Sequence, residues 1–116
     1  MTYAEKLKDP RWQKKRLEIL QRDEWQCKKC NCLNCTLHVH HKTYEYGNNL
    51  WDYEDINFIT LCENCHKTVE YEKSLFNETV KYLLKNNIGY DKLLYLLKDT
   101  YFEVYKANEQ KGKING

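Results

Sequence analysis

Three C-x-x-C pairs constrain the fold of this chain more than any other feature of its sequence. They read CKKC at 27–30, CLNC at 32–35 and CENC at 62–65, and together they contain all six cysteines. Two residues between thiolates let both sulfurs reach one ion about 2.3 Å away, and two such pairs complete a tetrahedron. In a reducing compartment this spacing indicates zinc, whereas a secreted protein would use six cysteines for three disulfides. We therefore expect a structural Zn²⁺ site.

The choice of zinc ligands lies between the two upstream pairs, because CENC is the only pair further along the chain. A zinc knuckle turns sharply after its second cysteine, at a position with positive φ that Gly tolerates best and Asn next. Asn31 follows CKKC, whereas β-branched Thr36 follows CLNC. The predicted ligands are therefore Cys27, Cys30, Cys62 and Cys65. Cys32 and Cys35 are then loop thiols or ligands of a second ion.

Size and composition indicate one small folded domain. A chain of 116 residues is near the commonest domain length. Charged residues make up 31% of it, but 14% aromatic residues favour a small core over disorder. No apolar run approaches the roughly 20 residues of a membrane span, and the start MTYAEKLKDPRW lacks the pattern of a secretion signal. We expect a cytoplasmic protein without a membrane segment.

The first half of the chain predicts a helix followed by two strands. Asp9 and Pro10 are typical of a helix start, with a cap followed by proline at the first helical position, and this helix would run to about Arg22. Residues 37–43 alternate as a strand does, and the turn sequence GNN follows them. INFITLC, at 56–62, is a second apolar, β-branched strand. The predicted fold class is therefore α+β.

Two helices are predicted after the second strand. The first runs from Cys65 to about Lys85 and is stopped by NNIG, and Asp91 caps the second. The buried side of the first would carry Val69, Phe76, Val80, Leu83 and Leu84. We expect a domain over residues 1–75 and a C-terminal helical extension over 76–116 that packs on it and frays at its last residues. Alternatively these helices join two copies, so the oligomeric state is open between monomer and homodimer.

The histidines gather at the expected zinc site. Three of the four lie in LHVHHKTY, at positions 38, 40 and 41, and the fourth, His66, directly follows a predicted zinc ligand. Zinc between the cysteine pairs would bring the start of the following helix against this strand. One imidazole would then join His66 on a second metal while its neighbour reaches a water molecule beside it. The alternative is a strand whose histidines face solvent, with a structural His66.

The segments RDEWQCKKC, LHVHHKTY and NFITLCENCH, in this order and spacing, resemble the HNH endonucleases of the ββα-metal fold, specifically the zinc-stapled branch. The leading DPRWQKKRLEIL also looks like the helix that often precedes the motif in small phage and bacterial members. The resemblance covers roughly residues 9–72. It implies a small ββα-metal unit with a structural zinc, preceded by one helix and followed by a helical extension, that hydrolyses phosphodiester bonds of DNA.

Carried over by position, the resemblance assigns roles to the histidines. His41 would be the general base, and His40 and His66 would hold the catalytic metal. Glu70 stands one helical turn after His66, where a further ligand is sometimes found in the family. The cofactors implied are a structural Zn²⁺ and a catalytic divalent ion, either Mg²⁺, Mn²⁺, Ni²⁺ or Zn²⁺. His38 has no role that the resemblance supplies.

The middle residue of the motif falls on Asn57, nine residues before the last histidine. The resemblance implies that it ties down the loop that holds the base and does not touch substrate. Three other asparagines are alternatives for this role, namely Asn48, Asn49 and Asn64.

Positive charge is concentrated at the start of the chain. Residues 1–30 carry nine Lys or Arg against five acidic residues, and residues 51–75 carry two against six. Such a basic arm fits a surface that faces a polyanion, although a solvated charged face is the common alternative. DNA is the implied partner, and the candidates for contacts to its backbone are Arg11, Lys14, Lys15, Arg16 and Arg22. Arg16 and Arg22 are equally suited to packing or pairing within the fold.

A second class of function uses the same cysteines. A zinc-stapled module that binds DNA or protein without cleaving it would keep the four ligands and the basic helix. It has no need, however, of His40, His41 and His66 together. A redox enzyme built on one C-x-x-C pair would lack a reason for the second pair.

Overall fold

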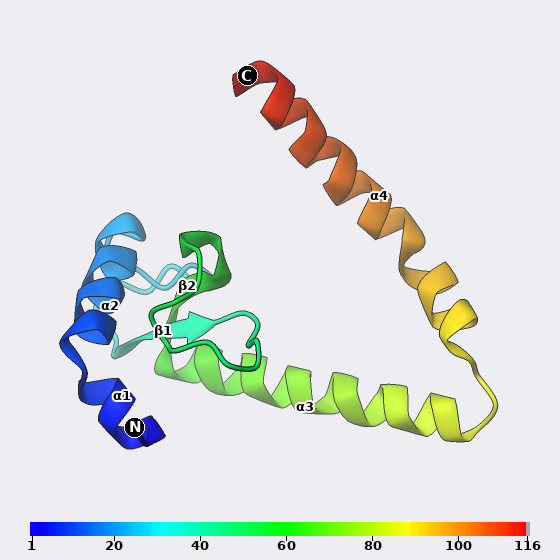
Figure 1. The fold of residues 1–116 in the computed structure, drawn as a ribbon, viewed down its shortest axis with the longest axis horizontal. Coiled ribbons are helices and arrows are strands. Elements are labelled where there is room, and N and C mark those ends of the chain that lie inside the picture. Colours follow the sequence, from blue (N-terminus) through cyan, green and yellow to red (C-terminus); the bar gives the residue numbers. More distant parts are fainter. Residues whose placement is uncertain (116) are drawn as a thin grey trace. The chain divides into compact units, whose positions relative to one another are not determined.

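The computed structural model describes residues 1–115 of the chain, and their side chains through residue 112 (Figure 1). Over these residues the fold is α+β, as predicted, with four α-helices and one two-stranded antiparallel sheet. The elements in chain order are α1 (Tyr3–Lys8), α2 (Pro10–Arg22), β1 (Leu37–His41), β2 (Phe58–Cys62), α3 (Glu63–Lys85) and α4 (Tyr90–Asn115). Gly116, the end of the tail that we expect to fray, lies outside the described residues.

The chain divides into two compact units. The first, Met1–Glu72, contains α1, α2, the sheet and the start of α3. The second begins at Lys73 and contains the remainder of α3 and α4. The division at residues 75 and 76, and the packing of the helical extension on the first unit, remain predictions.

Two helices, not one, precede the sheet, and they meet at Asp9. The Asp9 carboxylate accepts a hydrogen bond from the backbone N–H of Arg11 at 2.8 Å, and Pro10 occupies the first turn of α2, as predicted. The unexpected helix α1 is six residues long and is capped by the Thr2 hydroxyl, which accepts from the N–H of Glu5. A helix this short has too few turns to produce an apolar periodicity that sequence reasoning can detect.

The strands pair with Leu37 opposite Cys62 and His41 opposite Phe58. Both are shorter than predicted. β1 ends at His41, and a 3₁₀ turn at Asp55–Asn57 replaces the first part of the expected second strand. α3 follows β2 without a loop, because Glu63 directly succeeds Cys62.

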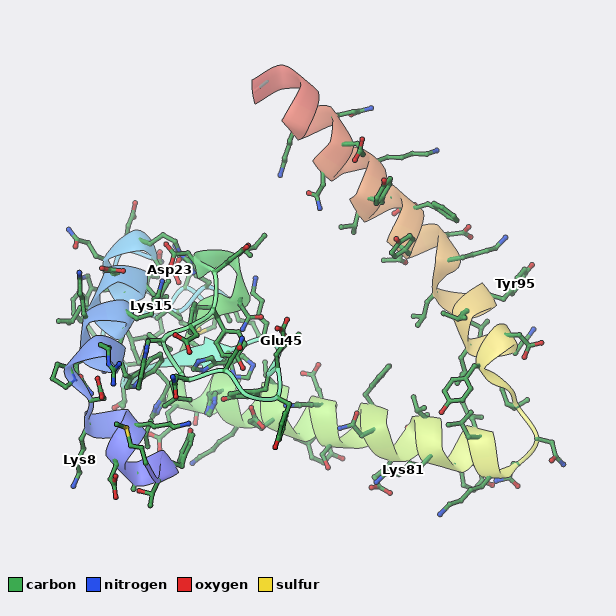
Figure 2. All side chains as sticks on the ribbon, viewed as in Figure 1. Lys8, Lys15, Asp23, Glu45, Lys81 and Tyr95 are labelled. Atoms are coloured by element: carbon green, nitrogen blue, oxygen red, sulfur yellow. A yellow bond between two sulfur atoms is a disulfide. The ribbon has the colours of Figure 1, made fainter. Side chains whose placement is uncertain are left out.

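The end of α2 and the segment after it form hydrogen bonds to the outer edge of β2, and Asp23, labelled in Figure 2, is one of the residues that do so. The Asp23 carboxylate accepts from the N–H of Thr60 at 3.0 Å, and Arg22 donates to the carbonyl of Phe58 at 2.8 Å. The Thr60 carbonyl in turn accepts from the N–H of Lys28 at 2.9 Å. These groups supply the hydrogen bonds that a third strand would otherwise make. They also fix α2 against the sheet.

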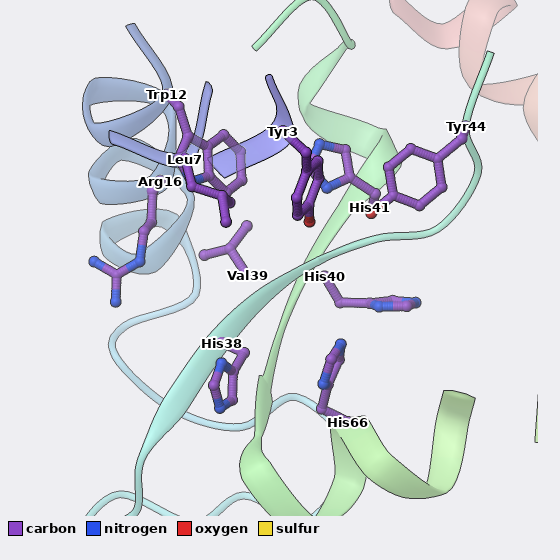
Figure 3. Close-up of a pocket in the computed structure, with 10 residues that line it drawn as sticks. All are labelled: Tyr3, Leu7, Trp12, Arg16, His38, Val39, His40, His41, Tyr44 and His66. Carbon is purple, nitrogen blue, oxygen red and sulfur yellow. The ribbon is translucent and has the colours of Figure 1, made fainter. Parts of the chain in front are cut away.

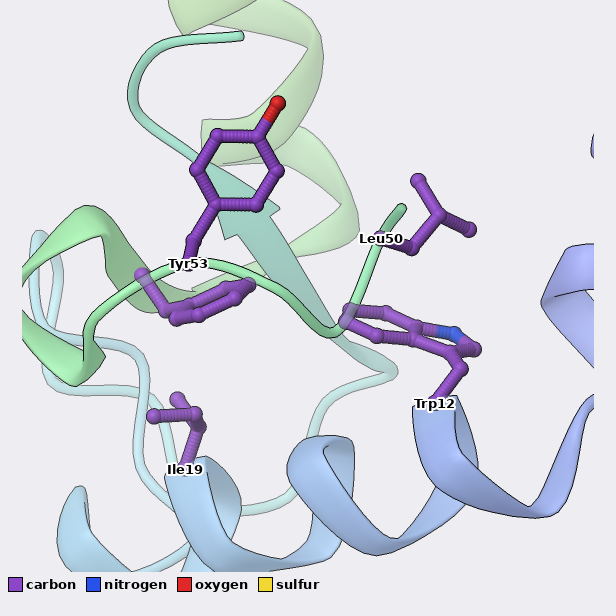
Figure 4. Close-up of a cluster of buried hydrophobic side chains, with 5 residues drawn as sticks. Trp12, Ile19, Leu50 and Tyr53 are labelled. Atoms are coloured by element: carbon purple, nitrogen blue, oxygen red, sulfur yellow. The ribbon is translucent and has the colours of Figure 1, made fainter. Parts of the chain in front are cut away.

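The core between α2 and the sheet is small and mainly aromatic. Trp12 and Ile19 project from α2 toward Leu50 and Tyr53 (Figure 4), and Phe58 of β2 completes the cluster. Burial of each such side chain stabilises the fold by about 1.5–3 kcal/mol. A second cluster surrounds the cysteines and consists of Cys27, Leu61 and Cys62, with Leu37, Ile59 and Val69 packed against it.

No residue of α3 is fully buried, although Val69 packs against the second cluster. Phe76, which we expected on the buried side, is 59% exposed, and Val80, Leu83 and Leu84 are partly exposed. None of the described helices has the length and apolar character that a membrane crossing requires.

Candidate metal centres

Four cysteines from two distant segments form the first candidate centre. The sulfur atoms of this cysteine cluster all lie within 4.8 Å of one another, and the cluster consists of Cys27, Cys30, Cys62 and Cys65. The sulfurs of Cys30 and Cys62 are 3.7 Å apart. Zn–S bonds of about 2.3 Å give a tetrahedron with edges of about 3.8 Å. The cluster can therefore hold a metal ion such as zinc.

Backbone geometry brings each pair of sulfurs together. Asn31 has a φ of 67°, as predicted for the residue after the knuckle, and its N–H donates to the carbonyl of Cys27 at 2.9 Å. The N–H of Cys30 points at the Cys27 sulfur at 3.5 Å, and the N–H of Cys65 points at the Cys62 sulfur at 3.4 Å. Such N–H groups stabilise the thiolate form that binds a metal.

The thiols of the cluster differ in acidity. Burial opposes ionisation of Cys27, but hydrogen bonds from backbone N–H groups, foremost that of Cys30, lower the pKa of its thiol to about 6. The neighbouring Cys62 side chain raises the pKa of Cys65 to about 12. The cluster thus retains protons near neutral pH, and a bound metal would displace them.

Cys32 and Cys35 lie outside the cluster and form a disulfide with each other across a Cα separation of 6.1 Å. We expected free loop thiols or ligands of a second ion. The backbone carbonyl of Cys32 accepts a hydrogen bond from the N–H of Cys27 at 3.1 Å. This segment therefore supports the knuckle through its backbone.

Two imidazoles and a carboxylate form the second candidate centre, with ligand atoms that all lie within 4.8 Å of one another. Figure 3 shows His40 on β1 and His66 on α3. Glu70 follows His66 by one helical turn on α3. An oxygen of Glu70 is 3.5 Å from Nδ1 of His40 and 3.9 Å from Nε2 of His66. Nitrogen and carboxylate donors together suit several divalent ions, including Zn²⁺, Ni²⁺ and Mn²⁺. Three protein ligands leave coordination positions open.

His41 lies on the opposite side of β1 from His40. Its ring is 4% exposed and packs between Trp12 and Tyr44, with ring centroids 5.1 and 4.9 Å away. Its Nε2 lies 2.8 Å from the carbonyl oxygen of Leu50. Because a carbonyl only accepts, Nε2 carries the proton and Nδ1 keeps its lone pair in the neutral ring. Burial lowers the pKa of His41, although the Leu50 carbonyl partly offsets this.

The histidines line a pocket of about 220 Å³. Its lining includes His40, His41 and His66 as well as His38, whose ring stacks on that of His66 at 5.3 Å. We call this the histidine pocket. The bend of the chain after β1 lets residues from both faces of the strand line it, which simple strand alternation does not predict.

The Asn57 side chain forms a clasp of hydrogen bonds with Thr43, in the segment that follows His41. Its Oδ1 accepts from the N–H and hydroxyl of Thr43, at 3.2 and 2.6 Å, and its Nδ2 donates to the Thr43 carbonyl at 2.8 Å. The carbonyl of Asn57 also accepts from the N–H of Lys42 at 2.7 Å. These hydrogen bonds tie down the start of the loop between the strands, and the assignment of Asn57 as the middle residue of the motif stays a prediction.

The five cationic residues proposed from the sequence have different surroundings. Arg11 pairs with Asp9 at 3.0 Å and lies over the ring of Trp51, and Lys15 pairs with Asp55 at 2.7 Å. Lys14 is exposed. These three residues lie on one turn and a half of α2, and the structure brings them together beside Trp51.

Arg22 and Arg16 lie closer to the interior. Arg22 donates to the carboxylate of Asp23 at 2.9 Å and to the carbonyls of Asp55 and Phe58, so its guanidinium is occupied within the fold. Arg16 lines the histidine pocket. Sequence reasoning treated the two residues alike, and their surroundings in the structure differ.

Sequence reasoning missed the surroundings of His41. The Leu50 carbonyl that fixes its tautomer comes from the loop between the strands, and a backbone group leaves no sequence signal. Tyr44 stands within LHVHHKTY, three residues after His41, and an aromatic residue so close to a histidine doublet could have indicated ring packing around His41.

No family model, curated protein or solved structure matches this chain.

Proposed function

We propose that this protein is a metal-dependent endonuclease of the HNH type that hydrolyses phosphodiester bonds in DNA. One observation carries the proposal. A set of metal-ligand side chains, His40, His66 and Glu70, converges beside a buried histidine whose tautomer leaves Nδ1 able to take a proton. His40, His41 and His66 line one pocket. A structural domain without catalysis has no need of this combination.

The order of the elements supports the same family. β1, a loop, β2 and the start of α3 form a strand–loop–strand–helix unit, and the cysteine cluster joins the segment before β1 to the junction of β2 and α3. This arrangement agrees with a zinc-stapled ββα-metal unit. The clasp between Asn57 and Thr43 agrees with the role that the middle residue of the motif has in that family.

The donor set fits a catalytic divalent ion, which His40, His66 and Glu70 would hold. Such an ion supplies Lewis-acid stabilisation of the charge that develops on phosphate and leaving-group oxygens. His41 supplies the proton acceptor. Water attacks the phosphorus in line, its proton passes to Nδ1 of His41, and the resulting imidazolium keeps donating from Nε2 to the Leu50 carbonyl.

The surroundings of His41 suit this role. Its lowered pKa, which results from burial, keeps the ring neutral and able to accept a proton at neutral pH. Packing against Trp12 and Tyr44 holds the ring in one orientation. The bond between phosphorus and the 3′ oxygen breaks, and that oxygen takes a proton from solvent water, which leaves 5′-phosphate and 3′-hydroxyl ends.

The experiment that tests the proposal is incubation of purified protein with supercoiled plasmid in the presence of Mg²⁺, Mn²⁺, Ni²⁺, Zn²⁺ or EDTA. We expect cleavage with at least one ion and none with EDTA. Asn57→Ala should reduce the rate, and Asn48→Ala is the matched control because Asn48 lies in the same loop but makes no clasp to Thr43. The absence of cleavage with every ion would favour the zinc-stapled binding module instead.

A further inference from the structure

Arg16 has surroundings that the proposed chemistry does not explain. It projects from α2 into the lining of the histidine pocket and is only partly exposed. Within the described part of the chain its guanidinium makes no ion pair or hydrogen bond, whereas Arg11, Lys15 and Arg22 all pair with carboxylates. A partly buried cation without a partner is costly, since it loses hydration without replacement. Such a group is typical of a site that binds an anion.

The rest of the pocket also favours an anion. None of the residues that line the histidine pocket is acidic, and four of them are histidines. His38 is one of these, and its ring stacks on that of His66 with an interplanar angle of 25°. A neutral imidazole still presents one N–H donor. Arg16 and His38 thus offer hydrogen-bond donors to the same space.

The arrangement along β1 sets Arg16 apart from the metal ligands, while His38 lies between them against His66. Figure 3 places Arg16 on the α2 side of the strand and His66 on the α3 side, with Val39 between Arg16 and His40 in that view. Arg16 is therefore set apart from the point where His40, His66 and Glu70 converge. An anion bound by Arg16 is therefore not the same anion as one bound at the metal ligands.

We propose that Arg16, assisted by His38, binds a backbone phosphate of the nucleic-acid strand that neighbours the phosphate to be cleaved. The identity of the strand rests on the proposed function, while the chemistry of the ligand, a phosphodiester monoanion, rests on the pocket. A planar guanidinium matches two phosphate oxygens with paired N–H groups. By holding one phosphate, Arg16 sets the register of the strand so that the next phosphate reaches His40 and His66.

The proposal assigns Arg16 to binding and not to the chemical step. Its loss should weaken the binding of DNA and raise KM while kcat changes little. The test uses His41→Gln protein in EDTA with a short labelled duplex, so that no cleavage occurs during binding. Arg16→Ala in this background should weaken binding about 10-fold or more, the effect expected for the loss of a charge-assisted hydrogen-bond pair. It should also lower the slope of log K against log salt by about 0.9.

Lys29→Ala is the charge control, because it removes one positive charge from the same compact unit at a position paired with Glu72 and outside the proposed DNA contacts. Its effect should be below about threefold, in keeping with a surface ion pair. Arg16→Lys keeps the charge but loses the planar fork, so we expect an intermediate affinity. Equal losses for Arg16→Ala and Lys29→Ala would overturn the proposal, since they would show a general effect of charge.

NMR of the arginine Nε–H groups identifies the ligand directly. Titration with a dinucleotide should shift the Arg16 resonance and leave that of Arg22 unchanged, because Arg22 is occupied by Asp23 and two backbone carbonyls. His38→Ala should weaken the response of Arg16. A response to inorganic phosphate with none to the dinucleotide would mean a site for free phosphate and would overturn the assignment to a strand. No response of Arg16 to either ligand would overturn the site itself.

These measurements separate the two proposals. If the wild-type protein cleaves no DNA but binds it through Arg16, the phosphate site stands and the nuclease proposal falls. If the protein cleaves DNA but Arg16→Ala leaves KM, affinity and salt dependence unchanged, the nuclease proposal stands and the phosphate site falls. Zinc content and circular dichroism of each variant establish that it is folded.

Discussion

The ring of His41 on β1 donates a hydrogen bond from Nε2 to the carbonyl oxygen of Leu50, at 2.8 Å, and both residues are buried. Leu50 lies in the long connection between the strands, where its side chain belongs to the core with Trp12. The packing of that connection therefore determines which nitrogen of His41 carries the proton. In this way a core contact controls the chemistry of the pocket.

The first prediction concerns His41. His41→Gln keeps an amide N–H for Leu50 and much of the side-chain volume, but it cannot take a proton from water. We expect cleavage to fall about 10²–10⁴-fold, the usual contribution of a general base, while zinc content, circular dichroism and DNA affinity stay unchanged. The measurement is the initial rate of plasmid cleavage at saturating metal. Wild-type rates in this variant would exclude His41 as the base.

The second prediction concerns the metal ligands. His40→Ala and His66→Ala should raise the Mn²⁺ concentration needed for half-maximal cleavage, with part of the activity recovered at high Mn²⁺. Glu70→Gln should act in the same direction but less strongly, because the Glu70 side chain is 48% exposed and water can replace its oxygen. A metal titration of the cleavage rate measures all three. Unchanged titration curves would show that these side chains do not hold the ion.

The third prediction concerns the cysteine cluster. Metal analysis should find at least one tightly held zinc per chain, and Cys62→Ser should unfold the domain, since binding of structural zinc is itself folding free energy. Cys32→Ser should be milder than Cys62→Ser, because it removes the disulfide with Cys35 but no sulfur of the cluster. Loss of zinc in Cys32→Ser but not in Cys27→Ser would mean that the upstream ligands are assigned wrongly.

The cysteine cluster also predicts a pH dependence. Zinc binding requires deprotonated sulfurs, and Cys65, whose pKa is raised to about 12 by the neighbouring Cys62 side chain, holds its proton at neutral pH without the metal. Binding must therefore release protons, so zinc affinity should fall as pH is lowered. Competition with a chelator at pH 6 and pH 8 measures this. An affinity that is higher at pH 6 would contradict thiolate ligation.

The sequence best predicts those parts of the site that are determined by a few adjacent residues. The spacing of the cysteine pairs predicts the cluster, and the conformational preference of Asn31 predicts the choice of knuckle, because both depend on a few adjacent residues. The resemblance to the HNH motif, whose middle residue falls nine positions before His66, singles out Asn57, the residue that hydrogen-bonds to Thr43.

Sequence reasoning fails where the deciding partner is distant or is a backbone group. Arg16 and Arg22 both lie on α2 and look equivalent in the sequence, but only Arg22 reaches Asp23 and the edge of β2. Which of the two guanidinium groups has no hydrogen-bond partner within the fold depends on how α2 packs against the sheet. The same reason hides the Leu50 carbonyl, which reaches His41 only because the connection folds back over the core.

The fourth prediction concerns Asp23, which is buried and accepts from Arg22 and from the N–H of Thr60. Burial alone would raise the pKa of Asp23, but these hydrogen bonds lower it below its ordinary value. The folded protein thus binds the proton more weakly than the unfolded chain does, so the stabilisation is present above the unfolded pKa of about 3.9 and is lost as pH falls through the folded value.

Asp23→Asn should therefore lower the free energy of unfolding by about 1–3 kcal/mol at pH 7, since it weakens charge-assisted hydrogen bonds at a buried position. Below the folded pKa the difference between the two proteins should narrow, because Asp23 is then protonated and neutral as well. Urea unfolding of both proteins at pH 7 and at acidic pH is the measurement. A difference that widens on acidification would contradict the assignment.

The last prediction separates structural from DNA-binding cations on α2. Arg22 donates to Asp23 and to the carbonyls of Asp55 and Phe58, so Arg22→Ala leaves the buried Asp23 carboxylate without its cation and removes a hydrogen bond from each of the two carbonyls. We expect a loss of about 2–4 kcal/mol in unfolding free energy and little change in the salt dependence of DNA binding. Lys14→Glu should do the opposite, because Lys14 is exposed: stability stays within about 0.5 kcal/mol, and DNA affinity falls about equally for all sequences. Urea unfolding and salt-dependent binding, measured for both variants, decide the matter. A stable Arg22→Ala protein with a flattened salt dependence would return Arg22 to the DNA contact surface.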